Sequence, residues 1–281
     1  MTKNKRKLIF TKMHGLENDF MIVNTLTQKF FFTKKIIQFF SNRYTGIGFD
    51  QLLLVEKPVF KNTNFHYRIF NANGSEVEQC GNGARCFAKF IFDQKLLNSK
   101  IIKVSTKNRI IKLKVINSDN ILVNMGSPEF HPKKIPFLEL FEKDIYSLSM
   151  NKEIIFFGVV SLGNPHCVVI VDDINKARVN EIGSYLESHV SFPNQVNVGF
   201  MQIINKNHIF LRVFERGVGE TRSCGSGACA AVAIGIRQKK LLNKVRVDLA
   251  GGKMLVKFDV KKNCLYMIGP AKKIYDGIIY Y

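Results

Sequence analysis

Short runs of alternating apolar and polar residues, separated by turn residues, recur along much of the chain. Residues 109–116 and 121–125 alternate on either side of residues 117–120, a pattern typical of strand, turn and strand. A second such region contains Gly251-Gly252, which suits a tight hairpin because glycine adopts positive φ without steric cost. Its expected strands are residues 245–249, 253–260 and 264–268. These connections are too short for parallel crossovers, so we expect mostly antiparallel sheets.

Two segments have a helical pattern instead. Residues 83–97 place apolar side chains at Phe87, Phe90, Ile91 and Leu97, with polar residues between them. Residues 227–241 differ, because residues 228–236 carry no polar side chain apart from a cysteine. A helix that is apolar all round is buried on every side, and strands wrapped around it would supply that burial.

The two halves of the chain repeat one another. Arg68 corresponds to Arg212 at an offset of 144, and the same offset relates Glu76 to Glu220 and Cys80 to Cys224. The offset changes slightly elsewhere, as loop insertions would produce. It is 146 for Asn18 with Asn164 and Gln51 with Asn197, and 143 for Val104 with Val247 and Gly126 with Gly269. Chance similarity between glycine-rich turns is the alternative, but several polar matches in one order favour two domains of one architecture.

Composition narrows the class of protein. Hydrophobic residues make up 46% and charged residues 23% of the 281 residues, which excludes wholesale disorder. No apolar run approaches the ~18–20 residues that span a bilayer, and the basic N-terminus lacks the ~7–15 apolar residues of a signal peptide. We therefore expect a soluble, cytoplasmic protein without a membrane partner.

The formal charge of +20 raises the question of nucleic-acid binding. The basic residues are spread along the chain together with Asn, Ile and Phe, all of which have A/T-rich codons, so nucleotide bias accounts for them. We expect no nucleic-acid partner. Six cysteines are sparse for a disulfide scaffold, and the closest spacings, Cys80 to Cys86 and Cys224 to Cys229, do not fit a zinc site.

Cys80-Gly81-Asn82-Gly83 and Cys224-Gly225-Ser226-Gly227 each lie where an expected helix begins, and Asn82 and Ser226 are N-cap residue types. The N–H groups of a first helical turn attract anions, and the same field lowers a cysteine pKa. If the two domains face each other, one thiolate removes a proton in the cleft and the other thiol returns one, which inverts a stereocentre. The alternative is two small buried residues that happen to begin helices.

Several polar residues suit an amino-acid ligand. Glu215 and Arg216 precede a glycine turn, where the arginine could grip a carboxylate and the glutamate could pair with an ammonium. His166 follows Asn164-Pro165 closely and could tune a thiol, although a lone histidine is usually structural. Ordinary turn residues and a surface ion pair are the alternatives. The uncharged candidates are Asn18, Gln51, Asn71, Asn164 and Asn197.

At these residues the sequence closely resembles the diaminopimelate epimerases, of the cofactor-independent amino-acid racemase family. The motifs that carry the resemblance lie at residues 12–20, 48–51, 70–76, 80–86, 163–167, 197–200, 215–217, 220–229, 269–271 and 275–277. The resemblance implies an α/β (α+β) fold of two pseudo-symmetric domains, each a mostly antiparallel sheet around a central helix, with the active site in the cleft between them. The implied halves are residues 1–124 with 270–281, and residues 125–269.

The resemblance also implies an activity and its residues. The reaction would be interconversion of LL- and meso-diaminopimelate without cofactor or metal, with Cys80 and Cys224 as the acid/base pair. His166 and Glu215 would tune the cysteines, and Tyr275 would take part in a homodimer. The implied ligand contacts are Asn18, Gln51, Asn71, Gly81, Asn82, Asn164, Asn197, Glu215, Arg216, Gly225 and Ser226.

Two residues depart from the family pattern. Glu17 stands where the family usually has glycine, and Asn73 where it usually has aspartate. Glu17 is expected to alter its turn, because non-glycine residues tolerate positive φ poorly. Two other activities use related chemistry or the same cleft: a proline or hydroxyproline racemase shares the paired cysteines, and a solute-binding module would keep the cleft without turnover.

Overall fold

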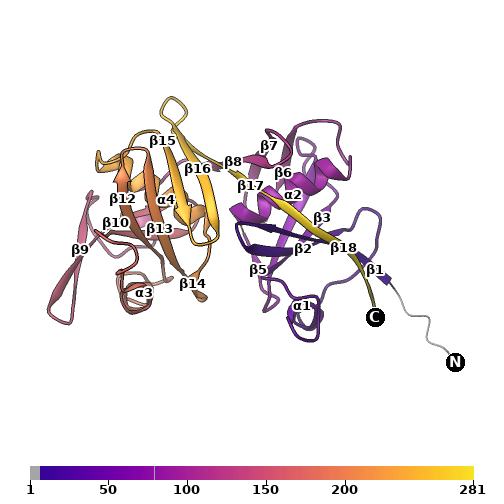
Figure 1. Ribbon diagram of the computed structural model, residues 1–281, viewed down its shortest axis with the longest axis horizontal. Coiled ribbons are helices and arrows are strands. Elements are labelled where there is room, and N and C mark those ends of the chain that lie inside the picture. Colours follow the sequence, from indigo (N-terminus) through magenta and orange to yellow (C-terminus); the bar gives the residue numbers. More distant parts are fainter. Residues whose placement is uncertain (1–6, 79) are drawn as a thin grey trace. The chain divides into compact units, whose positions relative to one another are not determined.

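The computed structural model describes residues 7–78 and 80–281 and divides into two compact units (Figure 1). The first unit comprises the chain up to Val123 together with Gly269–Tyr281, and the second comprises Asn124–Ile268. The boundaries expected from the sequence lie one residue later at each crossing. The chain leaves the first unit within strand β8 (Asn120–Gly126) and returns within β17 (Cys264–Pro270).

The first unit is a curved sheet wrapped around helix α2. Most neighbouring strands are antiparallel, with parallel pairs at β2–β3 and β4–β6. Besides β8, its elements are β1 (Lys7–Gly15), β2 (Asn18–Asn24), α1 (Lys34–Ser41), β3 (Gln51–Glu56), β4 (Phe65–Asn71), β5 (Glu76–Val77), α2 (Gly81–Asp93), β6 (Ile101–Ser105), β7 (Ile110–Val115) and β18 (Lys272–Tyr280).

The second unit repeats this pattern around helix α4. Its parallel pairs are β11–β12 and β13–β15. Besides β17, its elements are the 3₁₀ turn η1 (Pro132–Lys134), β9 (Tyr146–Met150), β10 (Glu153–Ser161), β11 (Pro165–Ile170), α3 (Val179–Glu187), β12 (Asn197–Asn205), β13 (His208–Glu215), β14 (Gly219–Thr221), α4 (Gly225–Arg237), β15 (Lys244–Leu249) and β16 (Gly252–Asp259).

Strand register establishes the internal repeat residue by residue. Phe20 pairs with Gln51 between β2 and β3, and His166 pairs with Asn197 between β11 and β12, at the offset of 146 that the sequence indicated. The architecture predicted from the sequence, two pseudo-symmetric domains of mostly antiparallel sheet, is therefore confirmed.

Strand β2 is buried on both faces, between the central helix α2 and the outer helix α1. Phe20, Met21, Ile22 and Val23 in β2 are all fully buried. Met21 and Val23 join the apolar cluster that includes Ile37 of α1, whereas Phe20 lies toward Gly83 of α2. A strand covered on both sides is a continuous apolar run rather than an alternating one. The all-round apolar face predicted for α4 is confirmed, because residues 227–235 are buried.

The two central helices begin and end earlier than their expected bounds. Both span 13 residues, and both end in a Schellman motif with a lysine in the left-handed region, Lys95 at φ 52° and Lys239 at φ 60°. Leu96 N–H donates to Ile91 and Lys240 N–H to Gly235, which closes each motif. Lysine is not a stop signal, so the sequence pattern placed both ends four residues too late.

Two outer helices and one turn also differ from the expectation. Helices α1 and α3 cover the outer faces of the two sheets and were not predicted. The β15–β16 hairpin turns through Ala250 and Gly251, one residue before the expected Gly251-Gly252, since Leu249 pairs with Gly252.

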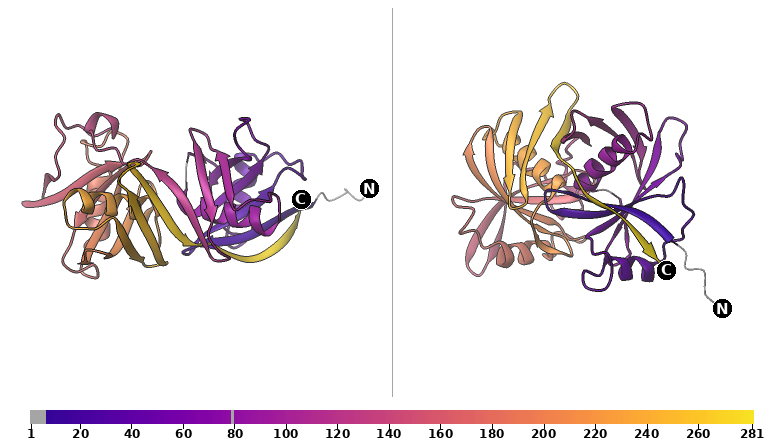
Figure 2. Two further views of the ribbon diagram at one scale, coloured as in Figure 1. Left: turned by 90° about the horizontal axis from the view of Figure 1, so that it is seen from above. Right: turned by 45° about the vertical axis from the view of Figure 1, so that its right-hand side comes forward.

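The last strand completes the first unit. Figure 2 shows β18 running along β1, with which it pairs from Lys7–Tyr280 to His14–Lys272. Thr11 donates to Asp276 at 2.7 Å across this pair. In the part of the chain described here, no helix has the length and apolar character needed to cross a membrane.

Candidate functional site

Each unit carries a cysteine as the N-cap of its central helix. Cys80 and Cys224 have extended backbones, and their sulfurs accept from the N–H groups of Gly83 at 3.3 Å and Gly227 at 3.4 Å. The expectation that the helices begin at Gly83 and Gly227 was wrong. Helical geometry begins at Gly81 and Gly225, so Asn82 and Ser226 lie inside the first turn and the cysteines themselves cap it.

We call the residues around Cys80 the first half-site. Cys80 itself is partly buried. Its thiol donates to Asn18 Oδ1 at 3.7 Å, and Asn82 Nδ2 donates to the same oxygen at 3.4 Å. Gly83 has no room for a side chain, since an added Cβ would lie 2.5 Å from the Tyr67 hydroxyl oxygen. The cysteine and both asparagines predicted for this half-site are thus brought together by the β1–β2 turn and the start of α2.

Gln51 and Asn71 lie opposite each other on β3 and β4. Gln51 Nε2 donates to Asn71 Oδ1 at 2.8 Å, while Gln51 Oε1 is buried and has no hydrogen-bond partner among the described residues. A buried acceptor without a partner costs free energy, so this oxygen is a candidate ligand contact.

The second half-site gathers around Cys224, which is 5% exposed. Burial, followed by the charge of Glu215, raises the pKa of the Cys224 thiol well above its ordinary value, although hydrogen bonds from Ser226 and Gly227 act in the opposite direction. The expectation that the helix N-terminus lowers the pKa is therefore wrong for Cys224. The removal of water outweighs the helix field here, and the structure favours a protonated thiol.

His166 and Asn164 lie beside this thiol cap. His166 Nε2 is 3.2 Å from Asn164 Oδ1, and Asn164 Nδ2 donates to Ser226 Oγ at 3.4 Å. Burial, helped by the charge of Arg216, lowers the pKa of His166 to about 3, so its imidazole is neutral. Ser226 Oγ in turn lies 3.6 Å from Cys224 Sγ.

Asn197 and Arg216 form the other side of this half-site. Asn197 Nδ2 donates to the Pro165 carbonyl at 2.9 Å, and its Oδ1 accepts from the Arg216 N–H at 3.1 Å. The Arg216 guanidinium donates to the Asn194 carbonyl at 3.0 Å. Glu215 accepts from the Thr221 hydroxyl at 2.5 Å.

The turns that contain the two departures from the family pattern, Glu17 and Asn73, both form. Leu16 and Glu17 adopt φ values of 59° and 64° between β1 and β2, so the hairpin forms with two non-glycine residues in the left-handed region. Asn73 Oδ1 accepts from the Ser75 N–H at 2.9 Å and from its hydroxyl at 2.6 Å. Tyr275 lies on β18, away from both cysteine turns in the chain, with its ring 6.0 Å from that of Phe10.

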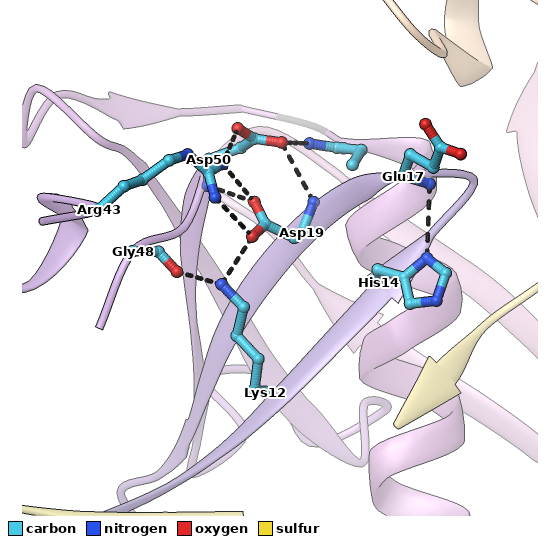
Figure 3. A network of polar contacts seen from close by, with 8 residues as sticks. Lys12, His14, Glu17, Asp19, Arg43, Gly48 and Asp50 are labelled. Atoms are coloured by element: carbon cyan, nitrogen blue, oxygen red, sulfur yellow. Dashed lines mark hydrogen bonds and ion pairs between the residues drawn. The ribbon is translucent and has the colours of Figure 1, made fainter. Parts of the chain in front are cut away.

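An ion-pair network that was not predicted from the sequence lies beside the β1–β2 hairpin (Figure 3). It joins the side chains of Lys12, Asp19, Arg43 and Asp50, and Asp50 accepts from Asn18 Nδ2 at 2.8 Å. One signal was present, because Asp50 directly precedes the predicted contact Gln51. Within the described residues, no group of three or more His, Cys, Asp or Glu side chains is placed to hold a metal ion.

The two units thus offer matched chemistry: a sulfur caps each central helix, with an asparagine amide beside it in the first unit and one bonded to Ser226 of the same turn in the second. This two-domain architecture places the chain in the fold class that includes amino-acid epimerases, racemases and the phenazine biosynthesis proteins of the PhzF family. The chain belongs to the diaminopimelate epimerase family, whose model matches residues 10–131 and 158–274. The family resemblance drawn from the sequence is confirmed.

Solved structures with the same fold are distant in sequence. A hydroxyproline epimerase from Agrobacterium vitis, with bound trans-4-hydroxy-L-proline, aligns over 99% of this chain and 94% of its own, at 12% identity and a TM-score of 0.74. A probable proline racemase from Agrobacterium radiobacter K84 aligns over 96% and 92%, at 12% identity and a TM-score of 0.71. A PhzF-family phenazine biosynthesis protein from Bacillus anthracis aligns over 98% and 99%, at 14% identity and a TM-score of 0.67.

Proposed function

We propose that the protein is a diaminopimelate epimerase, an isomerase that interconverts LL- and meso-diaminopimelate without a cofactor. The observation that carries this proposal is the pair of repeat-related cysteines, each capping a central helix, in a chain of the diaminopimelate epimerase family. A single capping cysteine would serve structure alone, but two at corresponding positions supply the two bases that inversion of one carbon requires.

In the proposed mechanism the two cysteine turns bind opposite faces of one substrate carbon. One sulfur, as thiolate, takes the Cα proton, and the electron pair passes into the carboxylate, where the helix N-termini stabilise the developing charge. The other sulfur, as thiol, returns a proton to the opposite face. Burial and the charge of Glu215 favour the thiol form of Cys224, which suits it to donate the proton in one direction of the reaction. The reverse reaction exchanges these roles.

The remaining polar residues support a substrate with two amino-acid ends. In the first unit, Asn18 offers an acceptor beside Cys80, and the Gln51–Asn71 pair offers Gln51 Oε1, which has no hydrogen-bond partner among the described residues. Arg216 and Glu215 add opposite charges in the second unit. Proline has one ammonium and one carboxylate, whereas a distal amino-acid group provides further partners whose binding energy assists the reaction at the other end.

Deuterium exchange tests the proposal. The protein is incubated in deuterated water with diaminopimelate, proline or trans-4-hydroxyproline, and α-deuterium is measured by mass spectrometry. We expect label in diaminopimelate alone. Label in proline or hydroxyproline instead would assign the other racemase activity, and no label in any of them would favour a binding module.

Cysteine variants test the mechanism. We expect Cys80→Ala and Cys224→Ala each to reduce epimerisation by on the order of 10²–10⁴-fold, because each removes one of the two proton-transferring groups. Cys86→Ala is the matched control, since Cys86 is a fully buried cysteine of the same helix as Cys80. Near wild-type turnover in either capping variant would exclude the two-base mechanism.

We also propose a homodimer that forms through β18 and a cytoplasmic location. The six cysteines of the chain are free thiols, and a reducing compartment keeps the reactive pair in that form.

For the dimer, β18 carries exposed apolar side chains at Ile274, Tyr275, Ile278 and Tyr280.

A further inference from the structure

The two ends of the Asn18 amide meet different partners. Its Nδ2 donates to Asp50 Oδ2 at 2.8 Å, and its Oδ1 faces the Cys80 thiol at 3.7 Å and Asn82 Nδ2 at 3.4 Å. An ionised carboxylate has acceptors and no donor, so only the nitrogen end of the amide can lie against Asp50. Asp50 therefore determines that the oxygen end faces the cysteine.

Asp50 is itself held from several directions (Figure 3). Arg43 donates to Asp50 Oδ1 at 2.8 Å and to both oxygens of Asp19 at 3.0 and 2.8 Å. The Asp19 N–H donates to Asp50 Oδ2 at 3.1 Å, and the Asp50 N–H donates back to Asp19 Oδ1 at 2.9 Å. Lys12 completes the network at 2.6 Å from Asp19. The contacts from Arg43 and from the Asp19 N–H therefore hold the Asp50 carboxylate against the amide.

The Asp19 carboxylate of the network is suited to remain ionised. Burial alone would raise the pKa of Asp19, but hydrogen bonds from Arg43 and Lys12 outweigh it and lower that pKa to about 2. Asp50 shares the Arg43 guanidinium at 2.8 Å. The Lys12–Asp19 pair is the buried part of the network, with the Asp19 side chain 15% exposed, so salt screens it less than an open surface pair.

The second repeat does not carry this arrangement. At the offset of 146, Asp19 corresponds to Pro165 and Asp50 to Val196, which is fully buried. A neutral imidazole, His166, lies against Asn164 instead. Neutral imidazole has one N–H donor and one acceptor nitrogen, so it can pair with either end of an amide. The fixed amide direction is therefore a property of the first half-site and not of the shared architecture.

We propose that Asp50 is a positioning residue that locks Asn18 with its carbonyl oxygen toward Cys80. This proposal rests on the proposed epimerase function. The oxygen accepts from the Cys80 thiol and, once substrate is bound, from an ammonium group of the amino acid. A reversed amide would present N–H groups to both and would favour thiolate over thiol. Two ionisable neighbours of Cys80, the buried Tyr67 of β4 and Cys86 of α2, are neutral, because burial and then the charge of Cys80 raise the pKa of each.

Asp50→Asn tests the proposal, because a carboxamide can present either end to Asn18. The first reading is the rate at which iodoacetamide alkylates Cys80 in the substrate-free protein, followed by peptide mass spectrometry from pH 6 to 10 in 0.5 M salt, which screens charge effects. We expect about fivefold faster alkylation below the Cys80 pKa, the effect of losing one hydrogen bond to the thiol. The second reading is kcat/KM for diaminopimelate, expected to fall about tenfold.

Asp19→Asn is the matched comparison, since it removes the same charge from the same network and leaves the Asp50 carboxylate on Asn18. We expect its Cys80 alkylation to stay within twofold of wild type. Circular dichroism checks folding, and Asp50→Ala serves as the second variant. Equal alkylation changes in the Asp19 and Asp50 variants, or none in either, would overturn the proposal. Because alkylation needs no substrate, it tests Asp50 separately from the epimerase activity.

Discussion

A sulfur that caps a helix is the feature on which the site depends at the scale of single residues. Thiol sulfur is a weak hydrogen-bond acceptor, and Ser, Thr, Asp and Asn are the preferred N-cap residues. Cys80 and Cys224 nevertheless accept from the third residue of their helices, where a serine hydroxyl would do so more strongly. The caps therefore sacrifice some helix stability and place a proton-transferring atom at the helix start.

The variant Cys224→Ser separates the capping role of this residue from its role in proton transfer. We expect Cys224→Ser to leave the free energy of unfolding within about 1 kcal/mol of wild type or to increase it, because the cap becomes stronger. Turnover should fall by on the order of 10²–10⁴-fold, because a hydroxyl is a much poorer proton donor and base than a thiol at neutral pH. Urea unfolding and an epimerase assay measure the two effects. A serine variant that turns over at the wild-type rate would contradict the assigned role.

The buried His166 predicts acid sensitivity of the fold. Its folded-state pKa, about 3, lies below the unfolded value of about 6.5, so the unfolded chain binds a proton that the native state excludes. The contribution of a neutral His166 to stability is thus fully present above pH 6.5 and is lost as the pH falls toward 3. Below pH 6, each pH unit should cost about 1.4 kcal/mol from this residue alone.

Urea unfolding at pH 7, 6 and 5 measures this loss. His166→Asn should flatten the pH dependence by that amount per unit below pH 6, since asparagine does not titrate. The matched comparison is His131→Asn, because His131 is exposed whereas His166 is buried. Parallel pH profiles for wild type and His166→Asn would show that this imidazole does not govern acid stability.

Candidate site residues could be predicted from the sequence where a matching residue occurs at the corresponding position of the other repeat. Asn18 and Asn164, or Gln51 and Asn197, identify each other through one offset, and the strand register places them accordingly. Asp50 has no polar counterpart in the second repeat, and its partner Arg43 lies in the loop after α1, a helix that was not predicted. The raised pKa of Cys224 depends on burial by many residues, which no local motif reveals.

Among elements, the central helices were easier to recognise than to delimit. The apolar run of residues 228–236 has no place outside a core, so it identified α4 as a buried helix. Its ends depend on Cys224 and Lys239, neither of which is a usual cap or stop residue. Helix α1 has eight residues and is anchored by the buried Ile37 and Phe40. A helix this short forms through packing rather than propensity, so its sequence gave little signal.

The helix ends offer a test at this scale. Lys239 has φ 60°, a conformation that costs a side-chain-bearing residue roughly 1–2 kcal/mol, so glycine should relieve strain. We expect Lys239→Gly to increase the free energy of unfolding by about 0.5–1 kcal/mol, after the greater entropy of the unfolded glycine chain is deducted. The matched control is Lys240→Gly at the next residue, which lacks positive φ and should not gain. Equal effects in both variants, measured by urea unfolding, would refute the cap argument.

For the whole molecule, the exposed apolar side chains of β18 underlie the proposed dimer. The substitution Tyr275→Asp would bury an unpaired carboxylate in such an interface. We expect Tyr275→Asp to weaken self-association at least tenfold in analytical ultracentrifugation. Tyr44→Asp is the control, because Tyr44 is 98% exposed and lies elsewhere in the first unit. A wild-type protein that is monomeric at all concentrations, or a Tyr275→Asp variant that associates like wild type, would exclude this interface.

The pairing of β1 with β18 also determines the order in which the molecule is completed during translation. Thr11 and its partner Asp276 are 265 residues apart, which a ribosome working at about 5–20 residues per second needs roughly 13–50 s to bridge. Residues 124–268 are contiguous and have all their strands before β18 is made. Throughout that interval one edge of β1 stays open, and open strand edges are where nascent chains aggregate. Chaperone demand should therefore come from the half of the protein that is synthesised first.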